Sequence, residues 1–226
     1  MTAFSTRLAW DGFVVVGDVI DDVLRDALAS QLAVLDSIGA GSRSLLDLAW
    51  CAELAQQLRR HAVLKELLPV DAVAVQCTLF DKSPTKNWLV ALHQDLSIPV
   101  KSRVDNADCS GWSEKEGQVY VQPPTRVLED IVAVRVHVDS CPAESGPLRV
   151  VPGSQAFGRL DAASAEQLRA ERGDVVVPVP RGGVLVMRPL LLHASSKASH
   201  PQPRRVLHFV FGPAVLRLGL EWQWAV

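Results

Sequence analysis

The residues with the clearest chemical potential are His93, Gln94 and Asp95, inside the stretch NWLVALHQDLSIP. In a β-strand successive side chains alternate between two faces, so His93 and Asp95 would point the same way and Gln94 the other way. An imidazole beside a carboxylate supplies two ligands of the 2-His-1-carboxylate triad, which holds non-haem Fe(II) with open coordination positions. Alone the triplet is weak support, because this pattern also arises by chance at polar strand ends.

A second histidine must complete such a triad, and the chain contains six histidines. His193 fits best, because it closes the apolar segment VLVMRPLLL just before the polar turn ASSK, as expected of a strand end that opens onto a pocket. The others have simpler explanations: His61 lies in a predicted helix, His200 in a polar loop, and His137 and His208 in predicted strands, where hydrogen-bonded core histidines are common.

An arginine pair, Arg204 and Arg205, opens a predicted strand soon after His193. A small dicarboxylate cosubstrate needs a fixed planar cation, and arginine grips a carboxylate bidentately where lysine offers a point charge. Strand alternation places Arg204 on one face with His208 and places Arg205 on the other face among apolar residues. The sequence alone does not say which face is inward, so either arginine remains a candidate.

The elements that must position these residues divide the chain into a helical part and a strand-rich part. Apolar spacing predicts helices in the first third, with a break at Gly39–Gly41, and short strands punctuated by Gly and Pro from Ala72 onward. The polar segment 101–127 is predicted to be a long loop or lid rather than a regular element. The predicted helices are 18–37, 44–60, 62–68 and 162–171, and the predicted strands are 10–17, 72–80, 87–96, 132–138, 148–151, 174–179, 183–187 and 204–211.

This order predicts an α+β fold, with an antiparallel double-sheet jelly roll and flanking helices. We expect one domain over residues 1–226, consisting of a helical flank at 1–70 and a jelly-roll core at 71–213 with its lid loop at 101–127. An immunoglobulin-like sandwich fits less well, because the leading helices need a sheet face to cover and the Cys-Trp-Cys arrangement is missing.

Composition excludes several classes of function. The net charge of -2 and the pI of 6.3 leave no basic stripe for a nucleic acid. The apolar runs are too short for a membrane helix, and the start lacks the pattern of a secretory signal, so a cytoplasmic location is expected. The four cysteines form no CxxC pair and are interpreted as reduced thiols: Cys51, Cys77, Cys109 and Cys141.

Six motifs in order resemble the phytanoyl-CoA dioxygenase family of Fe(II)- and 2-oxoglutarate-dependent oxygenases, particularly its short bacterial members. The resemblance runs from Leu79 to Phe211 and includes LFDKSPTKNW, LHQDL, VQPP, GPLRVVPGS, RGGVLVMRPLLLHASS and RRVLHF. It implies a double-stranded β-helix that binds iron through His93, Asp95 and His193. It also implies that Arg204 binds the 2-oxoglutarate carboxylate with Ser195 nearby, and that Gln94, Asn87 and Trp112 are candidate pocket residues.

The chain departs from the family pattern at Ser145, where Asn is usual, and at Gln155, where His is usual. Neither position is a metal ligand, so these departures concern a contact with the substrate or a loop and do not affect iron binding. Related halogenases replace the carboxylate ligand with a small residue so that chloride takes its place. The presence of Asp95 therefore favours hydroxylation of a C–H bond in a small molecule, with O2 consumed and succinate and CO2 released.

Two other classes of function remain open at this point. One is a cupin-like metal enzyme that uses a His/carboxylate site without 2-oxoglutarate. The other is a non-catalytic jelly-roll binding domain, which the fold alone would permit. The sequence shows no basic cluster suited to the phosphates of CoA, so a small molecule is the expected substrate.

Overall fold

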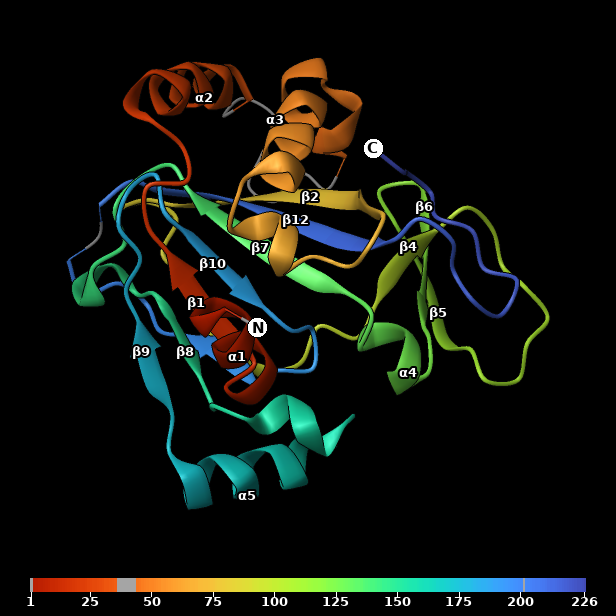
Figure 1. Ribbon diagram of the computed structural model, residues 1–226. Coiled ribbons are helices and arrows are strands. Elements are labelled where there is room, and N and C mark those ends of the chain that lie inside the picture. Colours follow the sequence, from red (N-terminus) through yellow and green to blue (C-terminus); the bar gives the residue numbers. More distant parts are fainter. Residues whose placement is uncertain (1, 36–43, 201) are drawn as a thin grey trace.

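Two antiparallel sheets form the centre of the computed structural model, which describes residues 2–35, 44–200 and 202–226 (Figure 1). The predicted α+β double-sheet jelly roll is confirmed. The larger sheet has the order β1-β10-β7-β12-β2, with bounds Phe13–Val16, Val184–Met187, Val132–His137, Arg204–Pro213 and Ala72–Lys82. The smaller sheet has the order β3-β11-β8-β9, with bounds Val90–His93, His193–Ser195, Leu148–Val150 and Val175–Val177.

The two faces of β12 have different partners. Leu207, Phe209 and Phe211 are fully buried in the core beneath α2 (Asp22–Leu35) and α3 (Ala49–Arg60), which cover the outer face of the larger sheet (Figure 1). Burial of each such side chain contributes about 1.5–3 kcal/mol, and a slip by one residue would turn all of them away from this core to the opposite face. The apolar face therefore fixes the register of β12 and turns Arg204 and His208 toward the interior.

The helices differ from the prediction mainly at their ends. α2 begins later than expected, and residues 36–37 and the predicted break at Gly39–Gly41 lie outside the described residues. The unpredicted α1 (Ala3–Trp10) begins at Thr2, whose side chain accepts a hydrogen bond from the backbone N–H of Ser5. The remaining helical elements are η2 (Leu45–Asp47), η3 (Leu64–Glu66), α4 (Thr125–Leu128), η4 (Ala143–Ser145), η5 (Ser154–Phe157) and α5 (Ala162–Arg172).

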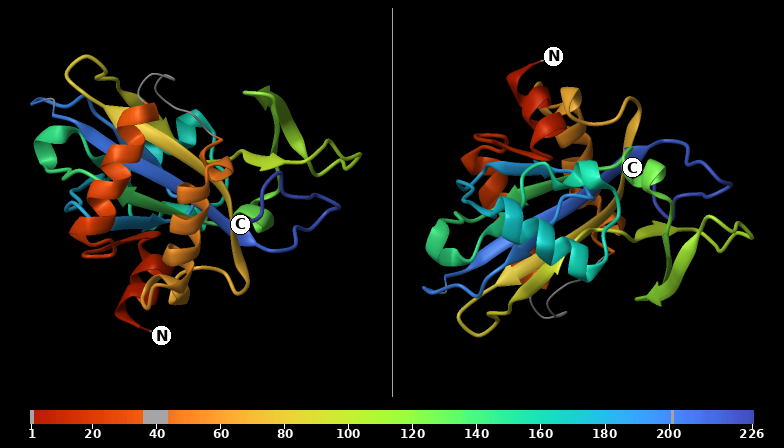
Figure 2. Two further views of the ribbon diagram at one scale, coloured as in Figure 1. Left: turned by 90° about the horizontal axis from the view of Figure 1, so that it is seen from above. Right: turned by 90° about the horizontal axis from the view of Figure 1, so that it is seen from below.

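The segment 101–127, predicted as an irregular loop, is irregular at 101–109 but forms a β-hairpin at 110–122, so the prediction is wrong for that part. β5 (Ser110–Lys115) and β6 (Gln118–Gln122) pair with β4 (Ile98–Val100) in a three-stranded sheet. The two residues of the turn have positive φ, 52° at Glu116 and 73° at Gly117, as tight hairpins require. The polar composition of β5 hides the alternation on which strand prediction depends. Figure 2 shows this sheet projecting to one side of the main sheets, next to the C-terminal segment.

The four cysteines are buried and free, as expected. Among the described residues, no helix is both long enough and apolar enough to span a membrane.

Candidate metal centre

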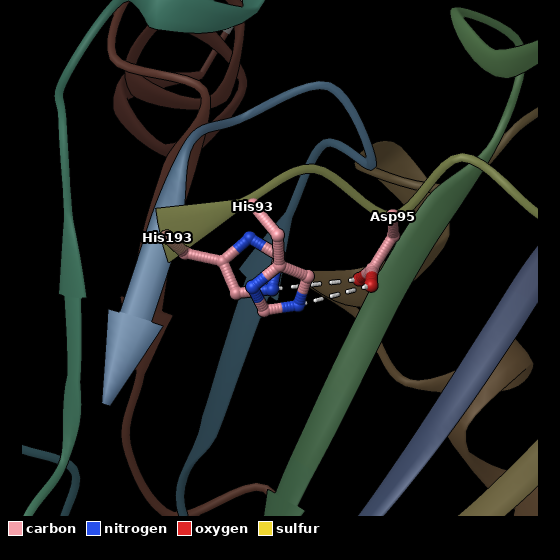
Figure 3. Close-up of side chains that lie close together, drawn as sticks. All are labelled: His93, Asp95 and His193. Atoms are coloured by element: carbon pink, nitrogen blue, oxygen red, sulfur yellow. Dashed lines mark ion pairs between the residues drawn. The ribbon is translucent and has the colours of Figure 1, made fainter. Parts of the chain in front are cut away.

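His93, Asp95 and His193 meet at one point between the two main sheets (Figure 3). His93 ends β3 and His193 begins β11, and the two residues are paired across these adjacent strands. Their ring centroids lie 4.1 Å apart. The Asp95 carboxylate faces both rings, with Oδ1 3.8 Å from His93 Nε2 and Oδ2 3.7 Å from His193 Nε2. Ligand atoms of all three residues lie within 4.8 Å of one another, a spacing that a single metal ion could bridge.

Asp95 reaches this point from beyond the end of β3, which is shorter than the predicted strand. Its backbone N–H donates to the carbonyl of Pro189 at 2.9 Å. Gln94 points the other way, as alternation predicted. Its amide donates to the carbonyls of Gly158 and Leu190, each at 2.7 Å, and accepts from the N–H of Leu160. The amide of Gln94 is therefore engaged by backbone rather than turned toward the triad.

The backbone also fixes the orientation of both histidine rings. His93 Nδ1 lies 2.8 Å from the carbonyl of Ala91, and His193 Nδ1 lies 2.9 Å from that of Leu191. A carbonyl oxygen only accepts, so Nδ1 carries the proton and Nε2 keeps its lone pair for a metal.

The charge states also suit a divalent metal. Burial lowers the pKa of His193 to about 4, which keeps this ring neutral. Burial by itself would raise the pKa of Asp95, but the neighbouring His193, His208 and His93 more than offset this effect, and the pKa is lowered. Two imidazoles and one carboxylate form the donor set typical of non-haem Fe(II) sites. The residues present thus fit this metal.

A cavity of about 100 Å³ adjoins the triad and is rich in positive charge. Arg204 is 3% exposed and donates to the carbonyl of Gly146 at 2.6 Å, while its Nε finds no acceptor among the described residues. Lys82, which pairs with Arg204 across β2 and β12, donates to Ser195 Oγ at 3.2 Å. Arg135 also lines the cavity, and Asp95 is the carboxylate in its lining. Buried cations without carboxylate partners suit an anionic ligand.

The two arginines of the pair have different surroundings. Arg205 lies outside the cavity and forms a two-pronged ion pair with Asp139, at 2.8 Å for both Nε–Oδ2 and Nη2–Oδ1. Burial and the charge of Arg204 lower the pKa of Lys82 to about 8. The geometry brings Arg204 and Ser195 into the cavity of the triad and leaves Arg205 outside it.

Two other candidate pocket residues lie away from this cavity. Asn87 exchanges hydrogen bonds with the backbone of Ala198, at 3.0 Å and 2.8 Å, so its amide holds the loop after β11. Trp112 lies on β5, with the guanidinium of Arg103 5.9 Å from its ring centroid. Neither residue lines the cavity at the triad.

Sequence reasoning missed three residues of the site. Lys82 ends a strand next to a turn, a position typical of exposed lysines, although it belongs to the motif LFDKSPTKNW. Arg135 and His208 were assigned to strands without a role, and both face the cavity. Their signal was alternation, because polar residues recur on the face of β7 and β12 opposite the apolar one. His137 is buried as predicted but without the expected hydrogen bond among the described residues.

A second cavity of about 280 Å³ lies on the other side of Asp95 and shares Phe80, Asp95 and His208 with the first. Lys115 and Tyr120 of the hairpin line one side of it, and Gln94 also borders it. The remaining wall is mixed, with the polar residues Gln76, Thr78 and Ser97 beside the apolar residues Leu96, Ile98, Leu128, Ile131, Ala133, Pro189 and Val210.

Comparison with known proteins agrees with this architecture. Residues 10–206 match the sequence model of the family described as "Phytanoyl-CoA dioxygenase (PhyH)". No curated protein matches the chain significantly. Among solved structures, the epimerase SnoN from nogalamycin biosynthesis, in complex with Fe3+, alpha ketoglutarate and nogalamycin RO, is similar with a TM-score of 0.72, 18% identity, and coverage of 93% of this chain and 82% of that chain.

Two further structures have the same fold. EctD from S. alaskensis, in its apoform, is similar with a TM-score of 0.72 and 20% identity. The match covers 96% of this chain and 79% of the EctD chain. HygX from Streptomyces hygroscopicus, with nickel and 2-oxoglutarate bound, is similar with a TM-score of 0.64 and 19% identity. The match covers 94% of this chain and 87% of the HygX chain. At such identities the likeness establishes the fold, a double-stranded β-helix.

Proposed function

Because the chain belongs to the phytanoyl-CoA dioxygenase family, we propose that it hydroxylates a C–H bond of a small molecule and releases succinate and CO2. It is a non-haem iron oxygenase dependent on 2-oxoglutarate. The observation that carries the proposal is the convergence of His93, Asp95 and His193 on one point, in the lining of a cavity that also contains Arg204 and Lys82.

The residues of the triad would hold Fe(II), with Nε2 of His93 and His193 and a carboxylate oxygen of Asp95 as ligands. When bound, Fe(II) and 2-oxoglutarate supply the oxidising chemistry with O2 as the oxidant, so that one oxygen atom enters the substrate and the other enters succinate. Arg204 and Lys82 would bind the distal carboxylate of 2-oxoglutarate, because both cations are buried without a carboxylate partner among the described residues. Ser195, to which Lys82 donates, lies at the same end.

The 280 Å³ cavity is the proposed substrate site. It adjoins the triad at Asp95, has a wall of mixed polar and apolar residues, and is large enough for a small molecule rather than a CoA thioester. The β5–β6 hairpin borders it through Lys115 and Tyr120, so this hairpin is the proposed lid that would exclude water during reaction. Asp95 fills the position that halogenases leave for chloride, which favours hydroxylation.

The test is O2-dependent conversion of 2-oxoglutarate to succinate by the Fe(II)-loaded protein, with and without candidate substrates. We expect slow uncoupled turnover in the wild type and loss of turnover in His93→Ala and Asp95→Ala. His200→Ala, in an exposed loop, is the matched control and should keep wild-type turnover. Full turnover in both ligand variants would show that the triad is not the reactive centre.

A further inference from the structure

Among the three proposed ligands, Asp95 has the fewest contacts that fix the orientation of its side chain. The two histidine rings are fixed by backbone carbonyls, whereas the Asp95 carboxylate accepts no hydrogen bond from any other described residue. Its side chain is 37% exposed and lies beyond the end of β3. Carboxylate ligands are usually oriented by a hydrogen-bond donor that does not itself bind the metal.

The candidate for this donor is His208, on the inner face of β12. Its Nε2 lies 4.0 Å from Asp95 Oδ2, and its ring stands edge-on to Phe80 at a centroid distance of 5.8 Å. This nitrogen-to-oxygen distance exceeds that of a hydrogen bond. Hydrogen bonds at active sites are commonly long without ligands and shorten once the site is loaded.

Arg135 determines which ring nitrogen of His208 carries the proton. The two residues are paired across β7 and β12, and Arg135 Nη1 lies 2.9 Å from His208 Nδ1. A guanidinium is always protonated and only donates, so Nδ1 must accept. A neutral imidazole then carries its hydrogen on Nε2, the nitrogen that faces Asp95.

Packing alone explains this arrangement poorly. Arg135 is only 6% exposed, has no carboxylate partner within 4 Å among the described residues, and leaves its buried Nε without an acceptor. Its guanidinium carbon lies 5.0 Å from the centroid of the Phe80 ring. A buried cation in this state costs stability, which an apolar residue would avoid.

We propose that Arg135 and His208 are positioning residues for the carboxylate ligand. Arg135 fixes the tautomer of His208, and His208 directs its Nε2–H at Asp95 Oδ2, which leaves the other carboxylate oxygen for the metal. The same proton removes the Nε2 lone pair of His208, so this third histidine cannot join the ligands and close an open coordination position. The inference depends on the metal centre of the proposed function.

Metal affinity tests the pair without requiring turnover. His208→Gln keeps an N–H donor and His208→Met has similar size without one; Arg135→Lys and Arg135→Met form the corresponding pair. We expect His208→Met to weaken Mn(II) binding by about 10- to 100-fold, as for other partners of ligands, and His208→Gln to restore most of this loss. In Co(II)-loaded protein, the visible spectrum should change in His208→Met and Arg135→Met but not in the control His200→Leu.

A double-mutant cycle separates positioning from general packing. Because Arg135 acts through His208, Arg135→Met should weaken Mn(II) binding in the wild type but not in His208→Met. Equal Mn(II) affinity of His208→Met and wild type, or additive losses in the double variant, would overturn the inference. If His208→Met fails to fold, the comparison of Arg135→Lys with Arg135→Met makes the same test. Failure of the wild type to bind Mn(II) would instead overturn the metal centre itself.

Discussion

The two cavities on either side of Asp95 differ in the positive charge of their walls. The smaller, of about 100 Å³, is lined by three buried cations, Lys82, Arg135 and Arg204. The larger, of about 280 Å³, has polar and apolar lining residues in similar number, and Lys115 is the cation among its described lining residues. The small cavity thus has the charge to bind a dianion, whereas the described lining of the large one offers one cation within a mixed polar and apolar wall.

The difference follows from which elements build each cavity. The inner face of the larger sheet supplies the cations of the small cavity, and the apolar outer face under α2 and α3 fixes the register that turns them inward. The large cavity is completed by the β5–β6 hairpin and the segment 96–98, which lie outside those sheets. The proposed cosubstrate site is therefore part of the scaffold, while the proposed substrate site is shaped by a peripheral element.

Among the variants that test this difference between the cavities, Arg204→Leu is expected to have the largest effect on 2-oxoglutarate affinity. Removal of one partner of a buried charge pair costs about 2–5 kcal/mol, so 2-oxoglutarate should bind at least about 30-fold more weakly. Arg205→Leu, which replaces the neighbouring arginine paired with Asp139, should leave the affinity unchanged. Calorimetry on Mn(II)-loaded protein measures both variants, and equal losses would remove the distinction between the two arginines.

Lys82→Met should have the next largest effect. A hydrogen bond to a charged group contributes about 1.5–3 kcal/mol, so we expect a loss of about 10- to 100-fold in 2-oxoglutarate affinity. Lys101→Met is the control, because Lys101 is exposed and pairs with Glu221 far from the cavity. Unchanged affinity in Lys82→Met would assign the dicarboxylate to Arg204 alone.

The affinity for 2-oxoglutarate should also depend on pH through Lys82. Burial and Arg204 lower the pKa of Lys82 to about 8, so the free protein carries this charge below pH 8 and loses it above. A bound dianion would raise that pKa, so affinity should be flat below pH 8 and fall by up to about tenfold per pH unit above it. In Lys82→Met this decline should disappear; if it persists, another group is responsible.

The smallest effect is expected from Lys115→Met. Lys115 lines the large cavity but not the small one, so 2-oxoglutarate affinity should match that of the wild type. This variant is the direct counterpart of Lys82→Met, because both replace one lysine by a residue of similar length. A comparable loss in both variants would mean that the two cavities are not functionally separate.

The sequence predicted the parts of the site that alternation and motif order determine. His93, Asp95, His193 and Arg204 were identified from their spacing and family motifs, and the structure brings all four into the lining of one cavity. The inward face of β12 was not predictable, because it depends on which face the helices cover. Lys82 was missed for a related reason, since only pairing with Arg204 shows that its strand end is buried.

The hairpin and the contacts of Gln94 and Asn87 were beyond prediction for another reason. β5 has one large apolar residue, Trp112, and no apolar alternation, so its strand character comes from pairing with β6 rather than from its own pattern. Gln94 and Asn87 lie near the triad in sequence, but their amides bond to backbone distant in the chain, at Gly158 and Ala198. Proximity along the chain does not reveal such partners.

The central claim is that one cavity holds a metal ion and 2-oxoglutarate together. Calorimetric titration of 2-oxoglutarate into wild-type protein, His193→Ala and Asp95→Ala, each with and without Mn(II), tests it most directly. We predict that Mn(II) strengthens 2-oxoglutarate binding in the wild type and has no such effect in either variant. Equal 2-oxoglutarate affinity with and without Mn(II) in the wild type would contradict the claim.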